Sequence, residues 1–250
     1  MRVVILAAGT GSRLGALTSD LPKPAVSVAG TPLLAYDMAF ARATGATAVA
    51  VVTGYRREVS EPLARSLGAD EVLWNPRFQG AGNLFSLQVA RDHGLLAQGF
   101  LMMNADHIYR PSIAALIAGV AAGAAEVTGF VDRDRRLTAD DMKVRLDAGG
   151  HITAIAKTLD AWDAGYVGMT FVPAARVPAY LAACDEVARR VGDQAHGEAV
   201  LGHLAGSPAP AATADISGHG WLEVDDAADL ERAERSLAAT PWYAGLLADG

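Results

Sequence analysis

Two cations and a run of small residues near the start of the chain could together bind a polyphosphate. Arg13 and Lys23 flank a loop in which Gly9 and Gly11 follow an apolar stretch. Glycines let main-chain amides approach an anion closely, and a guanidinium and an ammonium supply charge-assisted hydrogen bonds. The residues expected to line this loop are Leu6, Ala7, Ala8, Gly9, Thr10, Gly11 and Ser12.

The spacing of the glycines excludes two familiar phosphate loops. A P-loop carries a lysine directly after its last glycine, whereas Ala16 follows Gly15 here. In the dinucleotide fingerprint the glycines follow G-x-G-x-x-G, and Gly9, Gly11 and Gly15 are spaced one residue too widely for it. The loop therefore belongs to neither class.

Asp106 is the first candidate metal ligand. It follows a predicted buried strand from Gly99 to Met103. A carboxylate just past the carboxyl end of a central strand, near a phosphate loop, is well placed to hold Mg²⁺, which takes oxygen ligands. The adjacent His107 is expected to be a local hydrogen-bonding residue, since imidazole suits softer metals.

A second candidate site lies between residues 75 and 87, where a predicted strand ends and the chain bends through two glycines into a helix. The amide of Gly82 and the side chain of Asn83 could read the edge of a base, because an amide side chain both donates and accepts. Asn83 and Ser86 could also cap the helix. The two roles can coexist.

The order of predicted elements indicates an α/β fold. Val3 to Leu6, Ala48 to Thr53 and Glu71 to Trp74 are predicted strands, and helices are expected between them. This alternation predicts a mostly parallel central sheet with helices on both faces, whose ligands bind beyond the carboxyl ends of the strands. We expect one domain over residues 1–250 with a β insertion at about 130–172.

The predicted insertion contains a β-hairpin. Apolar residues alternate on both sides of Asp147-Ala148-Gly149-Gly150, which is typical of two strands joined by a glycine turn. This hairpin and a strand from Tyr166 to Val172 are expected to form one side of the ligand cleft. Asp132-Arg133-Asp134 precedes it, and its alternating charges favour a solvated loop over a metal-binding D-x-D pair.

Composition narrows the classes of function. A net charge of −7 argues against a nucleic-acid partner. The single cysteine, Cys184, allows no intrachain disulfide, so the cytoplasm is the expected location. The apolar stretches are too short for a signal-peptide core or a membrane span, and no membrane segment is expected.

The first residues resemble a family signature. Residues 6–14 read LAAGTGSRL and residues 22–24 read PKP. This text is similar to the L-A-A-G-x-G-[ST]-R-[LM] and P-K-P motifs of the nucleotidyltransferases that join a nucleoside triphosphate to a phosphorylated small molecule. The resemblance implies a Rossmann-like, GT-A-like fold, Mg²⁺ as cofactor, and catalytic roles for Arg13 and Lys23.

The second stretch narrows the resemblance. Residues 75–87 contain N-P and G-N-x-x-S-L motifs that resemble those of the cytidylyltransferases of phosphocholine, inositol phosphate and phosphonates. The Q-x-x-P-x-G-[TL]-A pattern of hexose-1-phosphate enzymes is absent. The resemblance implies CTP as donor, with Gly82, Asn83 and Ser86 at the nucleotide, and a small phosphorylated or phosphonate acceptor.

Later motifs imply further roles. Lys143 and Lys157 occupy the positions of lysines that face the acceptor phosphate in inositol-phosphate cytidylyltransferases, and Asp106 and Tyr166 are also expected to contact substrate. The ending Trp221-Leu222-Glu223-Val224-Asp225 places Asp225 as the second metal ligand. Asp226 replaces a usual Ser or Thr and could cap the next helix, so the choice between the two aspartates stays open. Glu223 would hold a metal-bound water.

The reaction implied is attack of an acceptor oxygen on the α-phosphorus of CTP with release of pyrophosphate. Inositol-1-phosphate is the first expected acceptor because of the two lysines and of the Asp106-His107 pair. A phosphonate, phosphocholine, or a sugar-1-phosphate with another nucleotide are alternatives, as is a regulatory nucleotide-binding module without turnover. Aromatic residues available to cage choline are Trp162, Tyr166, Tyr109 and Phe85. The apolar segment from Pro241 to Leu247 could pack on the core or on a neighbour in a homo-oligomer.

Overall fold

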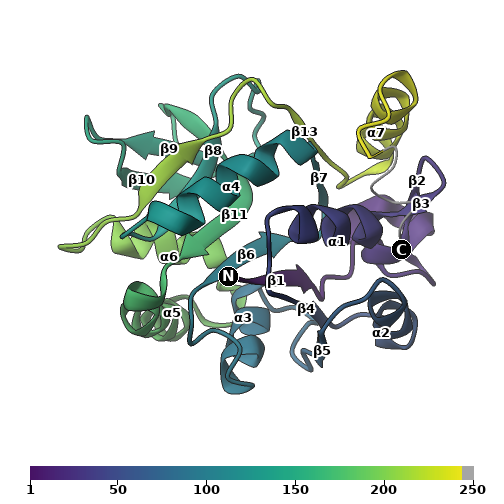
Figure 1. The fold of residues 1–250 in the computed structure, drawn as a ribbon, viewed down its shortest axis with the longest axis horizontal. Helices are drawn as coiled ribbons and strands as arrows, with labels where there is room; N and C mark the ends of the chain where they lie inside the picture. Colours follow the sequence, from purple (N-terminus) through teal and green to yellow (C-terminus); the bar gives the residue numbers. More distant parts are fainter. Residues whose placement is uncertain (244–250) are drawn as a thin grey trace.

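The computed structural model describes residues 1–243, which fold around a nine-stranded sheet (Figure 1). The strands are β1 (Arg2–Ala7), β2 (Ser27–Val28), β3 (Thr31–Pro32), β4 (Ala48–Thr53), β5 (Glu71–Trp74), β6 (Phe100–Asn104), β7 (His107–Tyr109), β8 (Thr128–Asp132), β9 (Lys143–Leu146), β10 (Ile152–Ala156), β11 (Ala164–Val172), β12 (Ala212–Asp215) and β13 (Trp221–Glu223). The α-helices are α1 (Leu33–Ala43), α2 (Arg57–Ser66), α3 (Leu84–Asp92), α4 (Pro111–Gly123), α5 (Val177–Val191), α6 (Gly197–Leu204) and α7 (Ala227–Ala239). Short 3₁₀ helices are η1 (Ser12–Thr18), η2 (Lys23–Ala25), η3 (Ala174–Arg176) and η4 (Gly192–Gln194).

The central strands of the sheet are parallel. The strand order is β10-β9-β11-β6-β1-β4-β5, with β8 pairing β11 and β12 pairing β8. β6, β1, β4 and β5 run parallel, whereas β11 is antiparallel to β6, β8 and β9. The expected α/β fold is confirmed, and the predicted hairpin forms as β9 and β10, which extend the same sheet.

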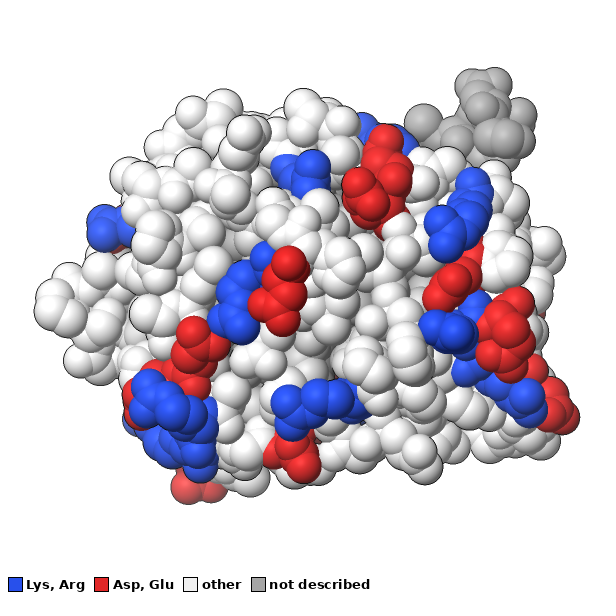
Figure 2. Space-filling view, turned by 90° about the horizontal axis from the view of Figure 1, so that it is seen from below, with Lys and Arg blue, Asp and Glu red and all other residues white. Residues whose placement is uncertain are grey.

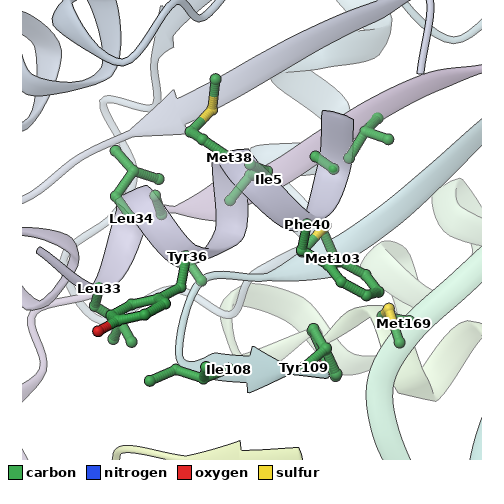
Figure 3. Packing of buried hydrophobic residues seen from close by; sticks show 14 of the residues in the cluster. Ile5, Leu33, Leu34, Tyr36, Met38, Phe40, Met103, Ile108, Tyr109 and Met169 are labelled. Atoms are coloured by element: carbon green, nitrogen blue, oxygen red, sulfur yellow. The ribbon is translucent and has the colours of Figure 1, made fainter. Parts of the chain in front are cut away.

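Helices cover both faces of the sheet and bury two clusters of apolar side chains. Along β1, Val3 and Ile5 enter the cluster covered by α1, α2, α4 and α7, and Val4 and Leu6 enter the cluster covered by α3, α5 and α6 (Figure 1). Because β1 is buried on both faces, its sequence is apolar without interruption from Val3 to Ala7. Figure 3 shows α1 packing in the first cluster beside Ile5, Met103 and Tyr109.

A two-stranded sheet that the sequence did not predict joins the ends of distant segments. β13 pairs antiparallel with β7, so that Glu223 lies opposite His107 and Trp221 lies opposite Tyr109. The amide of Val224 then donates to the carbonyl of Asp106 at 2.9 Å. This pairing brings the residue before β7 next to the segment that follows β13.

The single cysteine, Cys184, is free and buried, and burial raises the pKa of its thiol to about 12.

Two expectations from the sequence differ from the fold or extend beyond it. Asp132 is buried at the end of β8 and accepts from the indole Nε1 of Trp221 at 2.8 Å, so the prediction of a solvated loop is wrong at that residue. Tyr243 packs in the core, whereas residues 244–247 of the predicted apolar segment lie outside the described residues.

The described surface mixes charges of both signs. On the face seen in Figure 2, Lys and Arg side chains lie beside Asp and Glu. Within residues 1–243, no helix has the length and apolar character that crossing a membrane requires.

Candidate active site

The loop after β1 is packed against Lys23. Gly11 has a φ of 64°, in the left-handed region that favours glycine. A Cβ at this position would lie 2.8 Å from the Cβ of Lys23, so a side chain there would displace the lysine stem. The hydroxyl of Thr18 donates to the Gly11 carbonyl at 2.9 Å and holds this turn. The glycine therefore serves the close approach of loop and lysine as well as the turn.

Four side chains predicted from the sequence converge beyond the carboxyl ends of β1 and β6. The ammonium Nζ of Lys23 donates to Asp225 Oδ1 at 2.6 Å and to Asp106 Oδ2 at 3.2 Å. The guanidinium of Arg13 lies 2.7 Å from Asp225 Oδ2. The Lys23 side chain is 12% exposed, whereas that of Arg13 is 55% exposed. Two cations thus face two carboxylates across one partly buried site.

The carboxylates keep this site charged. Burial works against the ammonium of Lys23, but Asp106 and Asp225 outweigh it and raise the pKa of Lys23 above its ordinary value. Burial would likewise raise the pKa of Asp106, but Lys23 and His107 outweigh it and hold that pKa well below its usual range. Both groups therefore carry their charge at neutral pH.

Asp106 and Asp225 suit a divalent cation. Their oxygens share one ammonium, which shows that both can face a single positive centre. Carboxylate oxygens are ligands for Mg²⁺, which commonly uses one or two carboxylates and completes its shell with water and substrate phosphates. Within residues 1–243 no group of three His, Cys, Asp or Glu side chains is arranged to hold a metal. The remaining ligands would have to come from substrate and water.

The two neighbouring aspartates differ in their contacts. Asp226 is the N-cap of α7 and forms a capping box with Asp229, whose amide donates to Asp226 Oδ1 at 2.8 Å. Asp225 instead faces Lys23 and Arg13, and its own amide donates to Asp229 Oδ2 at 3.0 Å. The geometry therefore favours Asp225 as the ligand and confirms Asp226 as the cap.

His107 contacts Asp106 through the carboxylate oxygen that does not face Lys23. Its Nδ1 lies 2.5 Å from Asp106 Oδ1, as expected for a local hydrogen-bonding residue, and its ring stacks on that of Tyr109 and on that of Trp221, which also neighbour each other. Burial opposes a charge on this ring, but Asp106 outweighs it and raises the pKa of His107. Its Nε2 is 3.9 Å from Glu223 Oε1.

Arg135 is a neighbour of this site that sequence reasoning missed. Its guanidinium donates to Glu223 Oε2 at 3.0 Å, lies 3.3 Å from Asp141 Oδ1 and covers the ring of Trp221. The arginine stands in a run of mixed charges, and no local pattern marks it. Only the pairing of β7 with β13 brings Glu223 and Trp221 within its reach.

The expected base-reading residues lie against α6 and the segment before it. The amide of Gly82 donates to the carbonyl of Asp193 at 2.7 Å. The Asn83 side chain donates from Nδ2 to Asn104 Oδ1 at 3.1 Å and accepts at Oδ1 from the amide of Gly197 at 2.7 Å. Asn83 therefore ties together the start of α3, the end of β6 and the start of α6.

Asn83 does not cap α3 with its side chain, although it occupies the N-cap position. Ser86 is buried, and its hydroxyl accepts from Asn75 Nδ2 at 3.0 Å. Ser86 lies inside α3, so it does not cap the helix but ties it to the start of the preceding loop at Asn75. The capping interpretation of Asn83 is wrong, and base recognition by this stretch stays a prediction.

The three residues expected on the acceptor side have different surroundings. The ammonium of Lys143 donates to the carbonyls of Thr138, Asp141 and Lys157. Lys157 itself has an exposed side chain. Tyr166 is buried, and its hydroxyl is 2.8 Å from Thr170 Oγ1. Contact of these residues with an acceptor stays a prediction, and Lys143 would have to release main-chain carbonyls to make it.

The aromatic residues considered for choline are dispersed. Tyr109 lies in the apolar cluster under α1, and Tyr166 and Phe85 lie in the cluster on the opposite face of the sheet. Trp162 is 44% exposed beside Lys143. Tyr109 and Tyr166 therefore cannot share one cage.

Known proteins resemble this chain in sequence. Residues 2–139 match the nucleotidyl transferase family. Over 94% of its length the chain is 31% identical to the CMP-5'-(3-aminopropyl)phosphonate synthase of Streptomyces rubellomurinus, of which it covers 38%. Over 43% of its length it is 31% identical to the 2-aminoethylphosphonate cytidylyltransferase of Lancefieldella rimae, of which it covers 46%. The chain thus spans less than half the length of these curated relatives.

Among solved structures, the inositol-1-phosphate CTP transferase of T. maritima has the same fold. It superposes with a TM-score of 0.76 at 20% identity, over 94% of this chain and 96% of that chain.

Proposed function

The chain belongs to the nucleotidyl transferase family, and we propose that it transfers a cytidylyl group from CTP to a small phosphonate or phosphate monoester and releases pyrophosphate. The observation that carries this proposal is the convergence of Arg13, Lys23, Asp106 and Asp225 at one end of the sheet. A protein that only binds a nucleotide has no need of two carboxylates facing one positive centre beside the phosphate loop. The names of the two curated relatives support the cytidylyl group.

On the donor side, the loop from Leu6 to Ser12 offers main-chain amides, and Arg13 adds a guanidinium, for the β- and γ-phosphates of CTP. Lys23 would contact phosphate oxygens between the attacking and leaving groups. Mg²⁺, held by Asp106 and Asp225, would neutralise charge at the α-phosphate. We assign Gly82, Asn83 and Ser86 to the base pocket, where the hydrogen bonds of Asn83 fix the orientation of its amide.

On the acceptor side, the reaction requires positioning and no general base. An ionised phosphonate or phosphate oxygen carries no proton to remove, so the protein has only to hold it in line with the α-phosphorus and the leaving pyrophosphate. Arg135, Glu223 and Trp221 adjoin His107 and Asp106 and would border this acceptor.

A phosphonate is the acceptor we favour. A relative that aligns along 94% of this chain is named for a phosphonate. Recognition of inositol-1-phosphate by Lys143 and Lys157 would require two free ammonium groups, whereas that of Lys143 already donates to three carbonyls. Inositol-1-phosphate and phosphocholine are therefore the comparison acceptors.

Pyrophosphate release tests the proposal. Purified protein with Mg²⁺ would be given CTP, UTP, GTP, ATP or dTTP, each with 2-aminoethylphosphonate, 3-aminopropylphosphonate, inositol-1-phosphate, phosphocholine or glucose-1-phosphate. We expect release with CTP and a phosphonate, and its loss in Asp225→Asn but not in the matched Asp226→Asn. Pyrophosphate release only with a nucleotide other than CTP would contradict the cytidylyl assignment. No release with any combination of nucleotide and acceptor would contradict the proposed reaction.

A further inference from the structure

The ammonium of Lys23 stands where the two proposed metal ligands meet. It contacts Asp225 Oδ1 at 2.6 Å and Asp106 Oδ2 at 3.2 Å, and no more than 26% of any of these three side chains is exposed. Lys23 therefore has a contact that the family signature does not describe: in this structure it binds the carboxylates, whereas in the proposed reaction it binds phosphate.

Charges at this site are already balanced. Asp106 and Asp225 face Lys23 and Arg13, so the paired groups sum to zero formal charge. A divalent cation that entered alone would have to displace the ammonium and leave it without an anion in a partly buried site, which is unfavourable. A metal that entered with a polyphosphate would bring a new anionic partner for each displaced cation.

We propose that Lys23 is a built-in substitute for the metal, which holds Asp106 and Asp225 in position in the nucleotide-free enzyme and yields them only when metal and triphosphate arrive together. The inference rests on the proposed function in one respect, the identity of Asp106 and Asp225 as the metal ligands. Its consequence is that free metal binds weakly and the nucleotide strengthens metal binding.

The packing of Lys23 suits such an exchange. Its stem lies against Gly11, where an added Cβ would meet both Cβ and Cδ of the lysine, so the stem stays beside the phosphate loop. Rotation about the last bonds of the side chain would carry Nζ from the carboxylates toward phosphates bound by the loop. Within residues 1–243 Arg13 forms an ion pair with Asp225 alone and its side chain is 55% exposed, so it cannot hold the two carboxylates together.

Direct binding of Mn²⁺ tests the inference without any turnover. Electron paramagnetic resonance would measure free and bound Mn²⁺ with the full chain, in the absence and in the presence of CTP and with no acceptor. The variants are Lys23→Met, which removes the charge and keeps the stem, and Lys23→Arg, which keeps the charge. Arg13→Met is the matched control, since it removes the cation that contacts one carboxylate only.

In the wild type we expect weak binding of Mn²⁺ alone and an increase of about tenfold or more with CTP. Lys23→Met should bind Mn²⁺ alone about tenfold more tightly than the wild type, because the competing charge is gone. Lys23→Arg should show no such gain, and Arg13→Met a smaller one. Unchanged or weaker binding of Mn²⁺ by Lys23→Met would overturn the inference.

A thermal melt provides a second readout if Lys23→Met is less stable. The variant leaves two carboxylates without their cation, so Mn²⁺ should raise its Tm more than it raises that of the wild type. An equal rise in both proteins would also overturn the inference.

The metal measurement and the pyrophosphate assay fail independently. Tighter Mn²⁺ binding by Lys23→Met, together with no transfer by the wild type to any acceptor, would support the exchange and contradict the proposed reaction. Transfer activity with equal Mn²⁺ affinity in wild type and Lys23→Met would contradict only the exchange.

Discussion

Lys23 is the residue on which the chemistry of this site depends. Its ammonium is held by two carboxylates in the structure, and burial without them would disfavour its charge. The same charge is what a developing negative charge on transferring phosphates needs. One side chain thus supports both the architecture of the site and the proposed reaction.

Replacing Lys23 with Met should lower kcat by about 10²–10³, the range typical for loss of one charged donor to a transition state. Initial rates of pyrophosphate release at saturating CTP would measure the effect. Arg65→Met removes a cation exposed on α2, far along the chain from the loop, and serves as the control for net charge. A Lys23→Met enzyme with a third of the wild-type kcat would contradict the assigned role.

Asp37 is a buried carboxyl beside this site that the reaction does not use. It lies on α1, is 1% exposed, and neither carboxyl oxygen has a hydrogen-bond partner among the described residues. Burial raises its pKa well above 3.8, and Asp106 adds to the effect while Lys23 opposes it. The native state therefore keeps the proton of Asp37 to a higher pH than the unfolded chain does.

This raised pKa predicts how stability varies with pH. The contribution of Asp37 to the free energy of unfolding is fully present below pH 3.8 and is lost as pH rises through its folded pKa. Asp37→Asn should therefore gain stability over the wild type as pH rises from 4 to 7. Each unit of the pKa difference corresponds to about 1.4 kcal/mol, and each kcal/mol to about 2–4 °C in Tm.

Urea melts of both proteins at several pH values would provide the comparison. A difference in unfolding free energy that stays constant between pH 4 and 7 would contradict a protonated Asp37.

The pairing of β7 with β13 is the element that assembles the site. These strands are three residues each, and their register sets Glu223 opposite His107. Asp106 immediately precedes β7 and Asp225 closely follows β13, so the pairing brings the two proposed ligands together. The main-chain hydrogen bond between Val224 and Asp106 joins residues that are 118 positions apart in the sequence. Strands this short have no periodicity that a sequence window can detect.

The start of α7 provides a prediction at this scale. Asp226→Ala removes the capping box and should cost about 0.5–2 kcal/mol of stability. It should leave kcat within a few-fold, because the Asp225 amide keeps its hydrogen bond to Asp229. Asp225→Ala should instead lower kcat by about 100-fold or more. Thermal melts and initial rates of the two variants, measured together, would decide the assignment.

The prediction fails if Asp226→Ala loses as much activity as Asp225→Ala. Such a result would mean that both aspartates, or Asp226 alone, serve the metal.

At the scale of the whole molecule, local sequence was enough to predict the parallel strands and the loop. β4 and β5 have the predicted bounds, because the sequence pattern of a buried strand is contained in a single short window. The convergence of Arg13 and Lys23 with Asp106 follows from parallel strands that end at one edge of a sheet.

What could not be predicted depends on how loops and strands pack together. Lys143 looks like an exposed strand cation in the sequence, yet its ammonium donates to three main-chain carbonyls of the preceding loop and of the segment after β10. Asp132 looks solvated, yet Trp221 reaches it from the far end of the chain. Arg135 has no local signal at all. The contacts of Asp132 and Arg135 with residues of β13 arise only when β13 comes to lie beside the end of β8.

The most direct test of the central claim follows the α-phosphorus of CTP. The enzyme would be given Mg²⁺, CTP labelled at that phosphorus, and the phosphonate that gives the strongest pyrophosphate release. We expect the label to appear in a product that contains both cytidine monophosphate and the phosphonate, and we expect Asp106→Asn and Asp225→Asn to form none of it. Label released only as free CMP, or retained in CTP with every acceptor, would contradict cytidylyl transfer.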